Sequence, residues 1–271
     1  MSTFEVTFLG TNGSCAYNSG HRRKYGSNTV CIAVAAGDEV LIIDAGSGIC
    51  GLSELHDYKK DHLHLFFSHY HADHLDGLLS FPELFDPHKV FDIYGSDSED
   101  GDDLRSILEN YLSPSISPIG LDAFQARINY NTIASGDLIE LPGGVTVRTF
   151  AVSHPGGYMG CRIEYGGKSF CCCTDVELSK QSDRGGLLEF MKGADLLVLD
   201  SFFEDGKVIP GWGHSSWREC ATLAKEAGAK RLALIHFSPN FSDEDIDNIR
   251  QKACRVFPKT FAAADLMRTG I

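Results

Sequence analysis

The stretch His69-Tyr70-His71-Ala72-Asp73-His74 predicts a metal site. It lies between residues 64–67, a short apolar segment with the character of a strand, and residues 75–81, a segment with helical character. Imidazole and carboxylate groups bind divalent metals, and four of them occur here within six positions. The alternative, a surface turn that is rich in histidine, is disfavoured because the stretch follows directly on an apolar strand.

The spacing within this stretch indicates two metal ions rather than one. In extended backbone, side chains two positions apart point to the same side, so His69 and His71 can share one ion. Asp73 and His74 come where the chain turns and therefore point in another direction. One ion cannot easily collect all four groups from so short a segment, whereas two adjacent ions can.

Three further metal-binding side chains follow apolar segments later in the chain. These are His154 after residues 150–153, Asp175 after residues 171–174, and His236 after residues 232–235. Loops at the strand ends of an α/β sheet gather to form sites. A lone histidine in such a position is more often structural, but as an ordered set after the first motif these three residues are expected to be ligands.

Taken together, these residues resemble the five-motif signature of the metallo-β-lactamase superfamily. The resemblance extends from Leu41-Ile42-Ile43-Asp44-Ala45-Gly46 to His236-Phe237-Ser238-Pro239 and so covers most of the chain. It implies an α/β fold, an αββα four-layer sandwich of mixed sheets, formed by residues 1–271 as a single domain. The metals would lie at one edge of the two sheets.

The resemblance also implies a ligand set. The first metal would be held by His69, His71 and His154, the second by Asp73, His74 and His236, and Asp175 would bridge both. Two divalent ions could hold a bridging hydroxide as the nucleophile and stabilise the attacking and leaving oxygens. Asp73 would assist catalysis by helping to neutralise the cations. Zn²⁺ is favoured, and Mn²⁺ or Fe²⁺ accept the same ligands.

Two departures separate the sequence from other branches of the superfamily. Asp175 stands where secreted β-lactamases usually carry cysteine, and flavodiiron reductases carry glutamate in place of the second histidine. Hydrolysis of an antibiotic is therefore disfavoured. Asp44 is expected to orient a ligand imidazole, with a helix or turn cap as the alternative.

A second cluster, Gly211-Trp212-Gly213-His214-Ser215-Ser216, narrows the reaction. It resembles the His-Ser or His-Thr motif of the phosphodiesterase branch, which includes ribonuclease Z. The resemblance implies that His214 is a general acid for the leaving oxygen and that Asp200 orients it. Ser215 or Ser216, at a helix start, would suit a phosphate oxygen. The alternatives are a polar loop for His214 and a strand-end cap for Asp200.

The sequence favours a small anionic phosphodiester, in particular a cyclic nucleotide, over nucleic acid. Ribonuclease Z carries a tRNA-gripping arm between the positions that match His154 and Asp175, whereas here the interval is 21 positions, just enough for a hairpin. A net charge of −13 also argues against a nucleic-acid binder. Residues 10–14 and 23–29 resemble small phosphodiesterases; Arg23 or Lys24 could reach an anionic substrate, although solvated surface charge is the favoured interpretation.

Other functions stay open at this level. The first alternative is hydrolysis of a carboxyl ester, thioester or lactone on the same metals. The second is a tRNA 3′-processing endonuclease, or a non-catalytic sensor that binds metal.

Composition is consistent with a globular cytoplasmic protein. No run of eighteen apolar residues occurs, so no membrane span is expected, and the start at Met1 and Ser2 lacks the pattern of a secretory signal. Nine cysteines, three of them consecutive at 171–173, show no Cys-x-x-Cys spacing and are expected to be reduced. A homodimer is compatible with the sequence.

Turn residues and apolar periodicity predict the order of elements. Strands are expected at residues 5–9, 29–35, 39–43, 64–67, 90–94, 144–152, 161–165, 169–174, 194–200 and 231–235, and helices at residues 104–111, 216–227 and 242–257. Residues 85–135 are less regular and could form a mobile lid. Within them the acidic run 97–103 is expected to serve a helix start.

Overall fold

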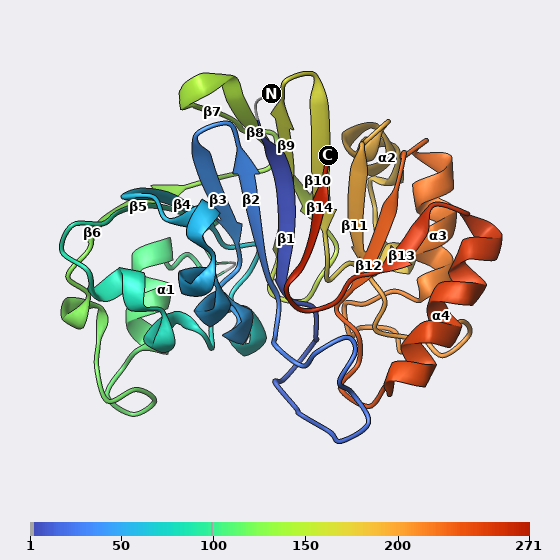
Figure 1. The fold of residues 1–271 in the computed structure, drawn as a ribbon, viewed down its shortest axis with the longest axis horizontal. Helices are drawn as coiled ribbons and strands as arrows, with labels where there is room; N and C mark the ends of the chain where they lie inside the picture. Colours follow the sequence, from blue (N-terminus) through green and yellow to red (C-terminus); the bar gives the residue numbers. More distant parts are fainter. Residues whose placement is uncertain (1–2, 99) are drawn as a thin grey trace.

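The chain forms two seven-stranded sheets that pack face to face, with helices on both outer faces (Figure 1). The structure is a computed structural model, and it describes residues 3–98 and 100–271. The layers confirm the expected αββα sandwich of mixed sheets. Met1, Ser2 and position 99 of the acidic run lie outside the described residues.

The first sheet has the strand order β14-β1-β2-β3-β4-β5-β6. Its strands are β1 (Phe4–Gly10), β2 (Cys31–Ala36), β3 (Glu39–Ile43), β4 (His62–Phe66), β5 (Val90–Gly95), β6 (Arg127–Thr132) and β14 (Met267–Gly270). The pairs around β1 and β2 are antiparallel. From β3 to β6 neighbouring strands run parallel, so their carboxyl ends meet at one edge.

The second sheet repeats this plan in the order β13-β12-β11-β10-β9-β8-β7. Its strands are β7 (Leu138–Leu141), β8 (Val145–Val152), β9 (Tyr158–Tyr165), β10 (Lys168–Cys173), β11 (Leu196–Asp200), β12 (Leu232–Ile235) and β13 (Thr260–Ala262). β7 to β10 are antiparallel and β10 to β13 are parallel. Both halves therefore place an antiparallel set of strands beside a parallel set.

Among the described residues, four α-helices and several short 3-10 segments form the outer layers. The helices are α1 (Leu104–Tyr111), α2 (Arg184–Met191), α3 (Trp217–Glu226) and α4 (Asp243–Val256). The 3-10 segments are η1 (Ser47–Glu54), η2 (His56–Tyr58), η3 (Ala72–His74), η4 (Leu78–Ser80), η5 (Pro82–Phe85), η6 (Leu121–Ala123), η7 (Pro142–Gly144) and η8 (Leu178–Lys180). Figure 1 shows α2, α3 and α4 on one outer face and α1 on the other.

Apolar side chains on alternating positions build three cores, one between the sheets and one under each outer layer. The three consecutive cysteines show the alternation: Cys172 faces the core between the sheets, and Cys171 and Cys173 face the helices. Because both faces of the central strands are covered, such strands are apolar throughout. The nine cysteines, all within the described residues, form no disulfide.

The sequence predicted the strands within a few residues. It also predicted helical character at residues 75–81, where the structure has a turn and the 3-10 segment η4 rather than an α-helix. Two backbone groups of this region, which an α-helix would pair internally, form hydrogen bonds with Ala45 after β3 instead. Ala45 N–H donates to the His74 carbonyl, and Gly77 N–H donates to the Ala45 carbonyl. These bonds hold the metal-site stretch against the first sheet and interrupt the helical ladder.

The sequence analysis missed β6, β7, β13, β14 and α2. β6 and β7 lie mostly half-buried or exposed, so their apolar pattern is weak, and α2 begins Arg-Gly-Gly, which disfavours a helix.

The expectation for the acidic run is confirmed at Asp103, whose side chain caps α1 by accepting from Ser106 N–H at 2.7 Å. The lid stays a prediction. Within the described ranges, no helix is both long and apolar enough to cross a membrane.

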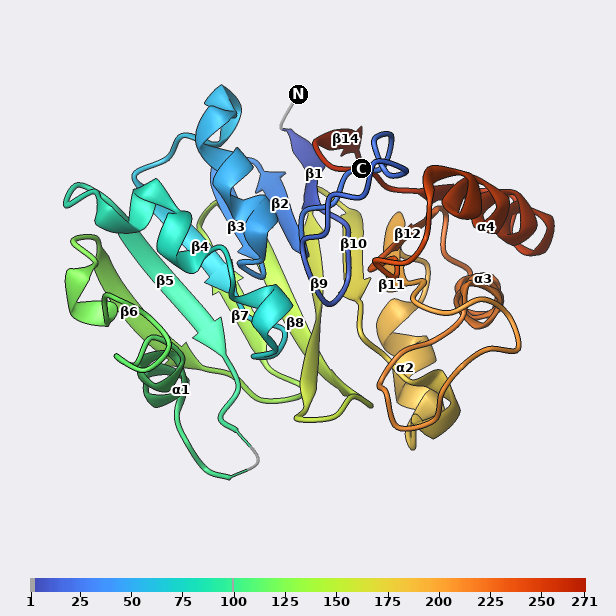
Figure 2. The ribbon, with the colours of Figure 1, turned by 90° about the horizontal axis from the view of Figure 1, so that it is seen from below.

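Asp265 fastens the long loop after β1 to the rest of the fold. Its Oδ2 accepts from the backbone N–H groups of Ser27 and Asn28, both at 2.9 Å, and its Oδ1 accepts from Thr11. Figures 1 and 2 show this loop, in blue, beside α4 at the edge where the carboxyl ends of the parallel strands meet. The loop therefore belongs to the rim of the metal-site edge.

Replacing Asp265 by alanine is expected to lower the free energy of unfolding by about 2 kcal/mol or more, because several partly buried donors lose their acceptor. Burial raises the pKa of Asp265 from 3.8 to about 6. The contribution of protonated Asp265 to the free energy of unfolding is fully present below pH 3.8, and it is lost as the pH rises through 6. Denaturant unfolding should therefore show a larger loss at pH 5 than at pH 7. Asp38→Ala, a fully exposed carboxylate, serves as the control; an equal loss at both pH values contradicts the assignment.

Candidate metal centre

The expected ligands lie at one edge of the sandwich, where strands of both sheets end. His69, His71, Asp73 and His74 follow β4, His154 follows β8, Asp175 follows β10 and His236 follows β12. Six of the seven are buried, with His71 more exposed. The fold thus brings together every residue that the sequence analysis proposed as a ligand.

Three residues at this edge hold an uncommon backbone conformation. Asp44, Asp175 and His236 have φ angles of 61°, 54° and 54°. Positive φ is uncommon outside glycine and costs roughly 1–3 kcal/mol for each residue. Each directly or closely follows a buried strand, so the reversal in backbone direction turns its side chain into the site.

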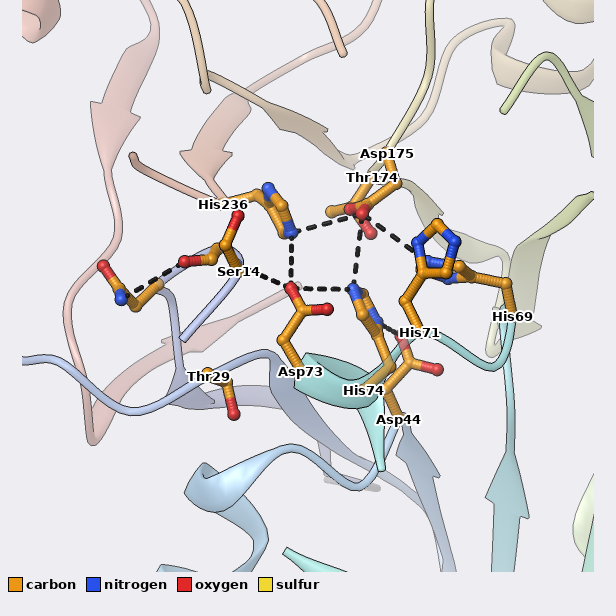
Figure 3. A network of polar contacts seen from close by, with 12 residues as sticks. Ser14, Thr29, Asp44, His69, His71, Asp73, His74, Thr174, Asp175 and His236 are labelled. Carbon is orange, nitrogen blue, oxygen red and sulfur yellow. Dashed lines mark hydrogen bonds and ion pairs between the residues drawn. The ribbon is translucent and has the colours of Figure 1, made fainter. Parts of the chain in front are cut away.

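The Asp175 carboxylate stands between the two expected ligand groups. Its Oδ2 lies 3.8 Å from Nε2 of His69, 3.3 Å from Nε2 of His74 and 3.2 Å from Nε2 of His236. Figure 3 shows these three imidazoles directed at the carboxylate from different sides. The position suits a carboxylate that is shared by two ions, as the resemblance implied.

The remaining ligands separate into two groups around Asp175. One ring nitrogen each of His69, His71 and His154 lie within 4.8 Å of one another, and so do single ligand atoms of Asp73, His74 and His236. In the first group His154 Nε2 lies 3.1 Å from His71 Nδ1. In the second His236 Nε2 lies 3.2 Å from Asp73 Oδ2, which also accepts from Ser14 N–H at 2.7 Å.

Hydrogen bonds at Nδ1 orient three of the ligand imidazoles. His74 Nδ1–H donates to Asp44 at 2.8 Å, and His154 Nδ1–H donates to the Gly213 carbonyl at 2.8 Å. The Ser68 hydroxyl donates its proton to Asp44. The Ser68 hydroxyl oxygen therefore acts as the acceptor for His69 Nδ1–H, at 3.1 Å. Each bond fixes the tautomer that leaves Nε2 bare for a metal. Asp44 thus orients a ligand imidazole, as expected.

The residues fit a pair of divalent ions. His69 Nε2, His74 Nε2 and Asp175 Oδ1 are buried without a hydrogen-bond partner among the described residues, which is costly unless something else binds them. Burial lowers the pKa of His69 well below its usual value and that of His154 to about 4, so both rings are neutral and can donate a lone pair. Burial disfavours a positive charge on His74, but the carboxylates of Asp44 and Asp175 outweigh the effect of burial and raise the pKa of His74. The surroundings of this ring therefore favour a cation.

His214 lies beside the metal ligands and is held by Asp200. Asp200 is fully buried at the end of β11, and its Oδ2 accepts from His214 Nδ1–H at 3.2 Å. The His214 ring stacks on Phe202 with centroids 4.5 Å apart. A ring nitrogen of His214 lies within 4.8 Å of ligand atoms of His154 and Asp175. Because Nδ1 is occupied by Asp200, Nε2 is the atom available to a bound molecule.

The comparisons with known proteins agree with this geometry. A sequence model of the beta-lactamase superfamily domain matches residues 40–237. The chain belongs to the metallo-β-lactamase superfamily. Over 86 residues it is 44% identical to a ribonuclease Z of Brevibacillus brevis, a match that covers 30% of this chain and only 27% of the relative. A ribonuclease Z of Trichodesmium erythraeum is 24% identical over 97% of this chain and 94% of its own length.

Solved structures of the superfamily share the fold over the whole chain. The metallo-β-lactamase fold protein YhfI from Bacillus subtilis superimposes with a TM-score of 0.77 at 20% identity and covers 100% of both chains. PqqB from Methylobacterium extorquens, solved with Zn²⁺ bound, gives a TM-score of 0.70 at 19% identity over 98% of this chain and 100% of its own. At such identities the likeness establishes the fold.

The expected substrate contacts of Ser215 and Ser216 need correction. The Ser215 hydroxyl donates to the Val176 carbonyl and accepts from Leu178 N–H. The Ser216 hydroxyl belongs to the capping box of α3 with Glu219. Both serines are about 1% exposed, so in this arrangement neither hydroxyl is available to a phosphate oxygen. Their role is to position the loop that carries His214.

Glu177 is a positioning residue that the sequence analysis missed. It is buried, and its Oε2 accepts from the backbone N–H groups of Gly211 and Gly213 at 2.9 and 3.1 Å. Gly213 has a φ of 80°, and a Cβ there would collide with the His154 ring. Glu177 therefore fixes a loop that supports both His154 and His214. The only feature of the sequence that could have indicated this role is the position of Glu177 two residues after the candidate ligand Asp175.

Lys24 is not a free anion receptor, and Arg23 is exposed at the surface. Lys24 Nζ forms an ion pair with Asp247 at 2.6 Å, and backbone N–H groups of Arg23 and Lys24 donate to Asp243. This agrees with the favoured interpretation of surface charge.

Two alanine variants test the assignment of the ligands. Relative to the unaltered protein, His71→Ala is expected to lose one metal equivalent, whereas Asp175→Ala loses two because that carboxylate lies between both groups. Metal content after purification, measured by inductively coupled plasma mass spectrometry, provides the readout, with the exposed His88 replaced by alanine as control. An Asp175→Ala protein with unchanged metal content would rule out the shared position.

Proposed function

We propose that this protein is a metal-dependent hydrolase of small phosphodiesters, with a cyclic nucleotide as the favoured substrate. One observation carries the proposal: His214, held by the buried Asp200, lies at the margin of a two-metal ligand cluster. A ring in this position is suited to protonate a leaving oxygen, which a phosphodiester of an alcohol requires. The relatives named ribonuclease Z are consistent with this reaction class.

Each of the two ligand groups would bind one of the metals. His69, His71 and His154 would hold one ion, Asp73, His74 and His236 the other, and Asp175 would contact both. A pair of divalent ions supplies Lewis acidity and an activated water, and Zn²⁺ is the favoured metal. Asp73 and Asp175 offset the positive charge, and Asp44 and Gly213 keep His74 and His154 in the ligand tautomer.

His214 would supply the proton at Nε2. Asp200 accepts from Nδ1–H and stabilises the positively charged ring. Burial alone would lower the pKa of His214, but the negative charges of Asp200 and Asp175 outweigh burial, so the pKa is raised. Phe202 covers one face of the ring and keeps it from rotating away. After transfer to the leaving oxygen, the neutral ring remains hydrogen-bonded to Asp200, so its position is kept for the next turnover.

An aromatic pocket next to His214 supports a small substrate with a planar group. It has a volume of about 340 Å³, and its lining combines four aromatic side chains with apolar, polar and charged ones: Phe202, Phe203, Trp212 and Phe241 with Ile209, Pro239, Ser238, Asn240, Glu204 and Lys207. Pockets of roughly 300–1,000 Å³ take small molecules. Trp212 is 55% exposed, so an entering ring would gain contact area there. A nucleoside base matches both the size and the aromatic lining.

Two features weigh against tRNA as the substrate. The interval between His154 and Asp175 is filled by the β9–β10 hairpin, whose turn is Gly166-Gly167, which leaves no length for an arm. The chain also carries a net charge of −13, and affinity for nucleic acid rests on neutralising phosphates with Lys and Arg.

His214→Ala tests the acid. We expect kcat to fall by about 10²–10⁴-fold for a cyclic nucleotide, whose leaving oxygen is an alcohol. With bis(p-nitrophenyl) phosphate the loss should be far smaller, because nitrophenolate leaves without a proton. Steady-state rates on both substrates, with metal content measured in parallel, give the comparison.

The same experiment separates the alternatives. Equal losses on both phosphodiesters would contradict a general acid. Activity on thioesters or lactones that survives His214→Ala, with none on phosphodiesters, would favour the ester-hydrolase alternative. Tight metal binding without turnover on any of these substrates would favour a sensor.

Trp212→Ala tests the pocket. Loss of an aromatic contact worth about 0.5–1.5 kcal/mol should raise KM for a cyclic nucleotide by roughly 2–12-fold with little change in kcat. A cyclic ribose phosphate that lacks the base should show no change. If KM rises equally for both compounds, the pocket does not hold the base.

A further inference from the structure

A second cluster of metal-binding side chains lies at the opposite end of β4 from the metal centre. His62 and His64 are on β4, and Asp92 is on the neighbouring strand β5. The parallel register pairs His64 with Asp92, and alternate positions of a strand share a face. One ligand atom each of His62, His64 and Asp92 lie within 4.8 Å of one another. His64 and His69 are five positions apart, roughly 16 Å along strand-like chain.

His64 is arranged like the ligand imidazoles of the main centre. It is 1% exposed, and its Nε2 lies 3.0 Å from Glu39 Oε2. Since the carboxylate can only accept, Nε2 carries the proton and Nδ1 presents a lone pair. This Nδ1 is buried and has no hydrogen-bond partner in the part of the chain that the structure describes. A carboxylate that binds one nitrogen while the other stays bare is the arrangement of metal-bound histidine.

Asp92 and His62 complete the set. Asn129 donates to Asp92 Oδ1 at 2.7 Å and so fixes the carboxylate with Oδ2 toward the histidines. Oδ2 lies 2.8 Å from His62 Nε2 and 3.8 Å from His64 Nδ1. These distances bracket the edge of about 3.3 Å that follows from tetrahedral bonds of about 2.0–2.1 Å. The His62 side chain is 47% exposed, so it can rotate by the small amount required, and an ion can enter from solvent.

We infer that His62, His64 and Asp92 form a mononuclear site for a divalent transition-metal ion, with a water molecule as a further ligand. Two imidazoles and one carboxylate suit Zn²⁺. An ion there would satisfy His64 Nδ1 and link β4 to β5 at the amino ends of the strands. A plain ion pair between His62 and Asp92 accounts for their contact but leaves the bare nitrogen of the buried His64 unexplained.

Zinc binding is measured by equilibrium dialysis of the full chain against buffered free Zn²⁺. His62→Ala should bind one equivalent less than the unaltered protein, and its hydrolytic activity should persist. His56→Ala, an exposed histidine outside the cluster, should bind the same amount as the unaltered protein. In an Asp175→Ala background, which disables the main centre, one equivalent should remain and should disappear when His62→Ala is added.

A milder variant tests the role assigned to Glu39. Glu39→Ala should weaken the affinity of this one equivalent by about 10–100-fold, as loss of a carboxylate partner does for other metal-bound histidines. The inference is overturned if His62→Ala and the unaltered protein bind equal zinc, or if the equivalent that remains in Asp175→Ala persists without His62. Neither result bears on hydrolysis at the main centre, so the two proposals fail separately.

Discussion

The interaction on which the rest of this structure depends is the contact of the buried Asp175 carboxylate with imidazoles from both sheets. Its Oδ2 lies within 3.8 Å of ring nitrogens of His69 and His74, carried by the first sheet, and of His236, carried by the second. Buried carboxylates and bare ring nitrogens are costly without a partner. The edge of the sandwich therefore suits cations, and candidate ligands from the two sheets meet there.

The fold supplies this edge by repeating one plan. In each half, antiparallel strands lead into a parallel set, and a strand at the change ends in an aspartate with positive φ: Asp44 after β3 and Asp175 after β10. The two have different tasks, since Asp44 orients His74 while Asp175 faces the ligands of both groups. The strained backbone is tolerated because fully buried strands on either side hold it in place.

Sequence reasoning succeeded where chemistry is concentrated along the chain and failed where contacts are set by packing. The gathering of the candidate ligands was predictable because each follows an apolar strand and strand ends gather at one edge. The helical character expected at residues 75–81 is limited to a 3-10 segment, because Gly77 N–H donates to the Ala45 carbonyl and Ala45 N–H donates to the His74 carbonyl. Ser215 and Ser216 were expected at the substrate because a helix start suits phosphate, yet their hydroxyls bond to Val176, Leu178 and Glu219.

By itself, the sequence determined the class of the site, because the residue types and their order define which groups can bind metal, and the sandwich followed from the family resemblance that these residues carry. Tertiary structure alone decided which partner each group has. Glu177 acquires its role only when the loop of Gly211 and Gly213 folds onto it. Likewise, His64 and Asp92 are 28 positions apart and meet only through the register of β4 with β5. The physical reason is that strand pairing and packing, which set these distances, depend on the whole chain rather than on neighbours in sequence.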